Sequence, residues 1–215
     1  SRFHAPVSFV GASMVETAQK FRARFTNQFM TCYPQNDPQQ VDRFLQSMLD
    51  VQRRDLSQWQ LPDLIKKQAP DFVEQCKSRG LENPLVLAGE IAAAEKRLTC
   101  IARLARFGIQ VWGDNGWKQI AHHGVTHRGY AGHFKELNRI YVGSTVNIDI
   151  GRFYQSDIVP MRIFDILACG GFVIAEYTED LEQLFEIDQE IVCWRTPEEL
   201  IEKTAYFLDH PHQAR

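Results

Sequence analysis

The chain has 215 residues, a formal net charge of −3 at pH 7, 44% hydrophobic residues and 24% charged residues. These proportions are typical of a globular protein with a hydrophobic core, and they exclude disordered, collagen-like and fibrous classes. Lysine and arginine are spread along the chain without a basic tract, so nucleic acid is not an expected partner.

Two features of the sequence bear on its cellular setting. The longest apolar stretch, residues 166–175, is about half the length that a membrane-spanning helix requires, so we expect no membrane span. The chain begins Ser-Arg-Phe-His, without an initiator methionine or an apolar leader, and we expect a processed chain or an excised piece of a longer one. The 5 cysteines are widely spaced without a Cys-x-x-Cys pair, which predicts unpaired thiols in a reducing, cytoplasmic setting.

The first half of the chain changes its pattern after residue 11. Residues 6–11 alternate like a short buried strand that ends at Gly11. Between residues 12 and 106, apolar residues recur at three- and four-residue spacing, and prolines interrupt the pattern, which predicts about five amphipathic helices. The last of these helices, near residues 85–107, ends at Gly108, which suits a C-terminal cap.

After Gly108, strand and helix patterns alternate regularly. The expected strands lie near 109–112, 125–128, 145–150, 172–175 and 191–194, and the expected helices near 134–141, 161–168, 181–185 and from Pro197 onward. Thr196 and Glu199 are spaced as a capping box for the last helix. The alternation predicts an α/β fold with a parallel sheet flanked by helices, in which residues 1–11 and 95–215 form the sheet domain and residues 12–94 a large helical insertion after the first strand.

Ligands of an open parallel sheet bind at the carboxyl ends of its strands, and the sequence offers a few candidate residues there. These candidates are Gly11, Gly113, Asp114, His127, Arg128, Gly129, Tyr130, Pro160, Met161 and Arg162. The loop of residues 151–160 is the richest segment because the helix that follows directs free backbone N–H groups outward, next to the guanidinium of Arg162. We therefore expect an anionic ligand that contains a diphosphate.

Two aspartates flank the start of that helix. Asp157 and Asp165 are eight positions apart, and either they hold the diol of a ribose or hexose, or they are an ordinary loop acid and an ordinary helix acid. No G-x-G-x-x-G or G-x-x-x-x-G-K-[ST] pattern occurs, which argues against a dinucleotide fingerprint or a P-loop. The spacing of the histidines near residues 122–133 does not suit a metal site, and we expect no metal there.

Several segments carry a family resemblance. They are residues 9–11, 111–117, 146–148, 162–174, 180–185, 197–200 and 208–211, of which 162–174 is the most specific. Together they resemble the C-terminal domain of GT-B-fold glycosyltransferases, and most closely the spore-maturation-protein-like branch of family 4. The resemblance covers most of the chain apart from the helical region.

The resemblance implies a Rossmann-like domain that binds a nucleotide-diphosphate sugar. Asp157 and Asp165 would replace the two glutamates of the family pattern, with Asp165 on the ribose diol and Asp157 near the sugar. Arg162 and the helix N-terminus would neutralise the leaving diphosphate, and residues 127–130 would lie near the base. Arg97 would match an arginine on the helix before the second strand. At the Gly11 turn, where relatives place a basic residue, the nearest cation here is Lys20.

The resemblance also implies what the chain needs in addition. Transfer would retain the anomeric configuration without a metal, and the nucleotide-diphosphate sugar would be the donor substrate, with no cofactor needed. The acceptor would be held by an N-terminal domain that this chain lacks, so the chain alone would bind nucleotide without turnover. Two alternatives stay open: a non-catalytic module whose helical insertion binds a protein partner, and another nucleotide enzyme, such as a dehydrogenase or an epimerase, that uses the same crevice.

Overall fold

The computed structural model describes residues 3–133, 135–155 and 157–214, and the chain divides into two compact units. The sheet unit contains the residues up to Ser13 together with Arg97–Gly151 and the chain from Gln155 onward. The helical unit contains Met14–Lys96 and, from the later part of the chain, Arg152–Tyr154.

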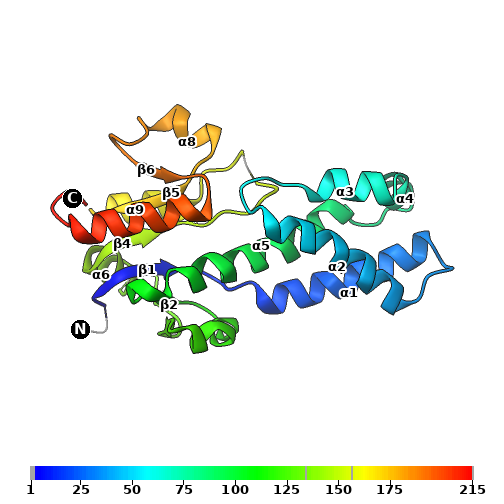
Figure 1. Ribbon diagram of the computed structural model, residues 1–215, viewed down its shortest axis with the longest axis horizontal. Helices are drawn as coiled ribbons and strands as arrows, with labels where there is room; N and C mark the ends of the chain where they lie inside the picture. The colour runs from blue at the N-terminus through cyan, green and yellow to red at the C-terminus, as the bar shows by residue number, and fades with distance from the viewer. Residues whose placement is uncertain (1–2, 134, 156, 215) are drawn as a thin grey trace. The chain divides into compact units, whose positions relative to one another are not determined.

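The sheet unit is built on a six-stranded parallel sheet (Figure 1). Its strands are β1 (Ala5–Val10), β2 (Gln110–Trp112), β3 (Thr126–His127), β4 (Ser144–Ile148), β5 (Val173–Glu176) and β6 (Val192–Trp194). They lie in the order β3-β2-β1-β4-β5-β6, and every pairing is parallel. The strand order reverses between β1 and β4, which defines the switch point where α/β sheets bind ligands. The predicted fold class is confirmed.

Helices of the sheet unit bury their apolar stripes against the strands. They are α6 (Leu137–Gly143), α7 (Met161–Ala168), α8 (Glu179–Leu184) and α9 (Pro197–Asp209). Ile140 on α6 and Ile163 and Ile166 on α7 join one buried cluster with residues of β5. α9 packs on β4, β5 and β6, and its buried Leu200 lies outside that cluster.

The helical unit consists of α1 (Val15–Cys32), α2 (Pro38–Arg54), α3 (Leu61–Gln68), α4 (Phe72–Ser78) and the part of α5 (Pro84–Arg103) that ends at Lys96. The prediction of about five helices before residue 106 is confirmed. Aromatic rings fill the core: Phe72 meets Phe25 edge-on at 5.5 Å and Phe29 at 4.9 Å between ring centroids. At the start of α2, Asp37 and Gln40 form a reciprocal capping box.

Four details differ from the sequence predictions. The helix expected to reach residue 107 ends at Arg103, and a 3₁₀ turn (Ala105–Phe107) follows, closed by Gly108 at φ 71°. A second 3₁₀ helix (Asn115–His123) follows β2 where only a turn was expected. At α9 the hydroxyl of Thr196 accepts from the Glu199 N–H, but the Glu199 carboxylate accepts from the N–H of Arg195, so the capping box is one-sided. The helix expected near 134–141 is α6, and residue 134 lies outside the described residues.

Candidate functional site

Arg97 joins the chain segments that follow β1 and β4. Its Nη1 donates to the Ala12 carbonyl oxygen at 2.8 Å, and its Nη2 donates to the Ile150 carbonyl oxygen at 3.0 Å. The side chain is buried, and both carbonyl groups lie just beyond strand ends, where the sheet offers no partner. Arg97 therefore fixes the two backbone segments that form the switch point.

Arg162 lies at the same place, on the first turn of α7. Its Nη1 donates to Oδ1 of Asp149 at 2.5 Å, and Asp149 is 1% exposed. The guanidinium carbons of Arg162 and Arg97 lie 4.8 Å and 5.5 Å from the ring centroid of Phe9, which is within the range of cation–π attraction. A Cβ on Gly11 would lie 2.9 Å from Nη2 of Arg162, so this glycine leaves the room that the guanidinium occupies.

Charges of both signs meet at the switch point. Burial raises the pKa of Asp149, and the Arg162 guanidinium opposes that rise. Glu176, the last residue of β5, accepts from the Gly151 N–H at 2.8 Å and brings a second carboxylate to the same edge. The guanidinium of Arg162 and the carboxylate of Asp149 thus hold each other in place, and Arg162 keeps N–H groups that Asp149 does not use.

The amino end of α7 adds backbone donors beside Arg162. Among the described residues, no side chain caps this helix at Pro160, and the N–H of Ile163 bonds back to the Pro160 carbonyl. The N–H groups of a first helical turn and the helix dipole both favour an anion. Met161 is 72% exposed, so the start of the helix is open to solvent.

Glycines bring the ends of the first three strands close together. The Gly11 N–H bonds to the Trp112 carbonyl and the Gly113 N–H to the Gly129 carbonyl, each at 2.9 Å. A Cβ on Gly113 would lie 2.1 Å from the Gly11 carbonyl oxygen, so only glycine permits this approach. Gly11, Gly113 and Gly129 thus lie together at one edge of the sheet, and their contact with a ligand stays a prediction.

Asp114 and His127 serve the backbone of this edge. The Asp114 carboxylate accepts from the Ser13 N–H at 2.8 Å, from the Ser13 hydroxyl at 2.5 Å and from the Gly116 N–H at 2.8 Å. The Nε2 of His127 lies 3.1 Å from the Gly113 carbonyl oxygen. In this structure both side chains shape the turns after β1 and β2, and direct ligand contact by either one stays a prediction.

The remaining predicted residues are Arg128, Tyr130, Asp157, Asp165 and Lys20. Arg128 and Tyr130 are exposed, and Arg128 donates to the Gln110 side chain at 2.9 Å. Asp157 is exposed and Asp165 is half-buried, and the roles of both stay predictions. Lys20 lies on α1 in the helical unit.

Tyr141 on α6 is a neighbour of the site that the sequence did not suggest. Burial raises the pKa of Tyr141 to about 12; Arg162 opposes this rise and Asp165 adds to it. Both charged side chains of α7 thus act on this hydroxyl group. The other residues missed are Asp149 and Glu176, and the available signal was an acid at or directly after the carboxyl end of a strand.

Residues 3–133, 135–155 and 157–214 contain no group of three or more His, Cys, Asp or Glu side chains placed to hold one ion. His122 and His123 are exposed on the 3₁₀ helix after β2, with ring centroids 4.0 Å apart. No helix in these residues is both long enough and apolar enough to cross a bilayer.

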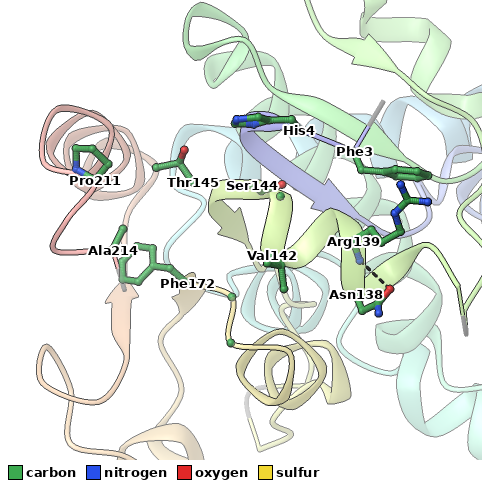
Figure 2. A pocket seen from close by; sticks show the side chains of 13 residues that line it. Phe3, His4, Asn138, Arg139, Val142, Ser144, Thr145, Phe172, Pro211 and Ala214 are labelled. Carbon is green, nitrogen blue, oxygen red and sulfur yellow. Dashed lines mark hydrogen bonds between the residues drawn. The ribbon is translucent and has the colours of Figure 1, made fainter. Parts of the chain in front are cut away.

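A large groove of about 1030 Å³ lies at the opposite, amino edge of the sheet (Figure 2). Its wall includes Phe3 and His4 before β1, Ser144 and Thr145 at the start of β4, and Phe172 before β5. The Arg139 guanidinium lies 4.3 Å from the Phe3 ring centroid. The buried Arg97 and Asp149 and the half-buried Arg162 and Glu176 lie at the other edge, so we assign the candidate site to the carboxyl ends despite the size of this groove.

The strand order and the switch point place the chain in the Rossmann-like class of α/β folds. A family model described as glycosyl transferase-like matches residues 94–215, more than half of the chain. The chain therefore belongs to this glycosyl transferase-like family. The matched segment contains β2 to β6 and α6 to α9, whereas β1 and most of the helical unit lie outside it. Neither the curated proteins nor the solved structures include a match to the chain.

Proposed function

We propose that the sheet unit is the donor-binding domain of a GT-B glycosyltransferase of the spore-maturation-protein-like branch, and that it holds a nucleotide-diphosphate sugar. One observation carries the proposal: Arg162, fixed by the buried Asp149, stands at the uncapped start of α7 and at the switch point of the sheet. Membership of the glycosyl transferase-like family supports the sugar donor.

The diphosphate would accept hydrogen bonds from the unused N–H groups of Arg162 and from the first turn of α7. Transfer breaks the bond between the anomeric carbon and the diphosphate, and the electron pair leaves on the diphosphate oxygen. Positive groups already in position stabilise that developing charge because they need no reorganisation during the reaction. Asp149 supplies this preorganisation by holding the guanidinium of Arg162.

The remaining roles rest on the family resemblance. Asp165 would hold the ribose diol, Asp157 would approach the sugar, and residues 127–130 would lie near the base. Transfer would retain the anomeric configuration without a metal or cofactor, and a second domain would hold the acceptor. Five free thiols support a reducing, cytoplasmic setting for this chemistry.

Calorimetric titration with UDP, GDP and NAD⁺ tests the proposal. We expect UDP or GDP to bind and to raise the melting temperature, as a ligand of the folded state must. Arg162→Ala and Asp165→Ala should each weaken that binding by about 1–3 kcal/mol, the cost of a lost charge-assisted contact. Arg139→Ala is the matched control because this arginine of the same unit lies at the opposite edge of the sheet.

Three outcomes would contradict the proposal. A response to NAD⁺ alone would favour a dehydrogenase or an epimerase. No response to any nucleotide would favour an interaction module. Equal losses in the Arg162 and Arg139 variants would place the diphosphate away from α7.

A further inference from the structure

Three consecutive residues of the loop between β4 and α7 belong to the helical unit. They are Arg152–Tyr154, whereas the residues on either side of them belong to the sheet unit. The residues just before them hold the candidate site together: Asp149 binds Arg162, and the Ile150 carbonyl binds Arg97. The loop therefore leaves the sheet unit directly after the groups that fix both arginines.

Glu90 on α5 is the common partner of two of these loop residues. The Tyr154 hydroxyl donates to Oε1 of Glu90, and Nε of Arg152 lies 3.5 Å from Oε2. Glu90 is 7% exposed. A buried carboxylate is costly unless it is paired, and Arg152 and Tyr154 are the partners that the loop supplies to Glu90.

Further close contacts hold Phe153 and Tyr154 of this loop. Nζ of Lys96, which is 1% exposed, lies 4.3 Å from the ring centroid of Phe153. The Tyr154 ring lies 6.1 Å from that of Trp59, and its Cδ1 would be only 2.7 Å from a Cβ on Gly89. All three loop side chains are thus held, and α5 supplies a partner for each of them.

We propose that Glu90 is a positioning residue for the donor site. By holding Arg152 and Tyr154 it anchors the loop, which limits the movement of residues 149–151 and keeps Asp149 and Ile150 on their arginines. The restraint is transmitted along the backbone between residues 150 and 152. One residue spans at most about 3.6 Å, so fixing Arg152 also limits how far Ile150 can move. The inference rests on the proposed function, since it takes the arginines as the nucleotide-binding groups.

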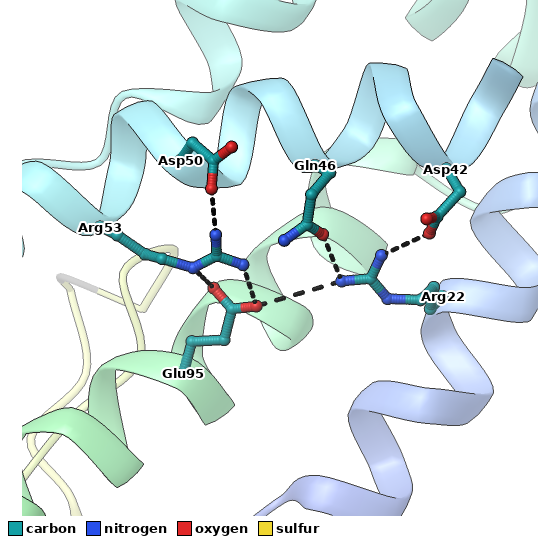
Figure 3. Close-up of polar contacts among 6 residues, drawn as sticks. All are labelled: Arg22, Asp42, Gln46, Asp50, Arg53 and Glu95. Atoms are coloured by element: carbon teal, nitrogen blue, oxygen red, sulfur yellow. Dashed lines mark hydrogen bonds and ion pairs between the residues drawn. The ribbon is translucent and has the colours of Figure 1, made fainter. Parts of the chain in front are cut away.

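Glu95, five residues further along α5, provides a matched control (Figure 3). Its carboxylate accepts from Nε of Arg53 at 2.9 Å and from Nη2 at 2.8 Å, and Nη2 of Arg22 lies 4.0 Å away. These partners lie on α2 and α1, and Asp42, Gln46 and Asp50 complete the same network. Glu95→Gln therefore weakens ion pairs that α5 makes with α1 and α2, and it removes no contact of the loop residues.

The experiment compares Glu90→Gln and Glu95→Gln by two measurements, UDP affinity and amide hydrogen exchange of residues 149–155. We expect Glu90→Gln to weaken UDP binding about 2- to 30-fold, the range of energetic coupling through a packed network, and to speed exchange in this segment. Glu95→Gln should leave both measurements near those of the unsubstituted chain. Tyr154→Phe removes a single hydroxyl group and should act in the same direction as Glu90→Gln.

The two measurements separate the possible failures. Unchanged exchange at residues 149–155 in both Glu90→Gln and Tyr154→Phe would overturn the anchor. Equal weakening of UDP binding by Glu90→Gln and Glu95→Gln would overturn the positioning role, because it would reflect general loss of helix stability. An unsubstituted chain that binds no UDP would overturn the proposed function, and faster exchange in Glu90→Gln would then mark the anchor as structural only. If Glu90→Gln does not fold, Tyr154→Phe carries both measurements.

Discussion

The two units of the chain keep their charges in different places. In the helical unit most ion pairs lie at the surface, as for Arg22 with Asp42, while aromatic rings such as Phe72 fill the core. In the sheet unit, polar side chains are buried at the strands: Asn147 accepts from Ser8 and donates to two carbonyl groups, and Asp149 binds Arg162. Buried polar groups cost stability unless they are paired, and the sheet unit pairs its buried Asp149 with Arg162 at the candidate site.

Glu90 departs from the surface ion pairs of the helical unit because its carboxylate is buried. It is the buried carboxylate of the helical unit among the described residues, and its partners come from the loop that leads away from the candidate site. Buried charge in the helical unit therefore occurs where the chain arrives from the sheet unit. The units thus differ in where their ion pairs lie: mostly at the surface in the helical unit, and at the buried Asp149 in the sheet unit.

The largest expected effect on this comparison comes from Gly113→Ala. The new Cβ would lie 2.1 Å from the Gly11 carbonyl oxygen, and a backbone atom cannot rotate away as a side chain would. We expect the free energy of unfolding of the sheet unit to fall by about 1–3 kcal/mol or more, as for other overpacked sites. Urea denaturation measures the loss, and nucleotide binding should weaken with it.

Gly132→Ala is the control for this substitution, because the nearest atom to its new Cβ is Oε2 of Glu136 at 3.5 Å. It should change stability by a few tenths of a kcal/mol. If both alanine variants unfold at the same urea concentration, the close approach of β1 and β2 is not what requires glycine at position 113.

Much of the fold was predictable because it depends on local patterns. The helix at 161–168 was predicted with the bounds of α7, since Pro160 disfavours an earlier start and the apolar residues recur at helical spacing. The gathering of Gly11 and Gly113 at one edge also followed, because the carboxyl ends of parallel strands lie together. Each of these inferences needs only neighbouring residues or one topological rule.

The pairings within the site were not predictable in the same way. Asp149 lies thirteen positions before Arg162, and their contact depends on how α7 packs beside β4. Glu90 and Tyr154 are 64 positions apart, and no periodicity indicates that a loop of the sheet domain joins the helical insertion. Partners of buried charges are set by tertiary packing, so the sequence shows the acids and bases without showing which of them meet.

Intermediate effects are expected at the helix caps, where the units can be compared directly. Asp37 caps α2 in the helical unit with a reciprocal bond from Gln40, whereas Thr196 caps α9 in the sheet unit from one side only. Asp37→Ala and Thr196→Ala should each lower the free energy of unfolding by about 0.5–2 kcal/mol, with the larger loss at Asp37. Thermal denaturation measures both variants. A larger loss at Thr196 would mean that its bond to the Glu199 N–H matters more than the complete box.

The smallest expected effect concerns pH and the charge buried in the sheet unit. Burial raises the pKa of Asp149 above its ordinary 3.8, so the native chain holds this proton more tightly than the unfolded chain does. The free energy of unfolding that Asp149 contributes therefore falls as pH rises from about 4 through the raised pKa. Asp149→Asn removes the titration, and the difference in unfolding free energy between the unsubstituted chain and this variant should decline over that window and level off above it.

Subtracting the unfolding free energy of Asp149→Asn from that of the unsubstituted chain cancels the contributions of the other carboxylates, because these groups titrate in both proteins. The sign of the slope is decisive, because a difference that increases with pH would mean that Arg162 stabilises the ionised carboxylate by more than burial penalises it. The pair would then resemble the surface ion pairs of the helical unit in its energetics, and the contrast between the units would rest on position alone. A declining difference means that the sheet unit keeps Asp149 at a cost in stability, as expected for a group that is retained to hold Arg162 in place.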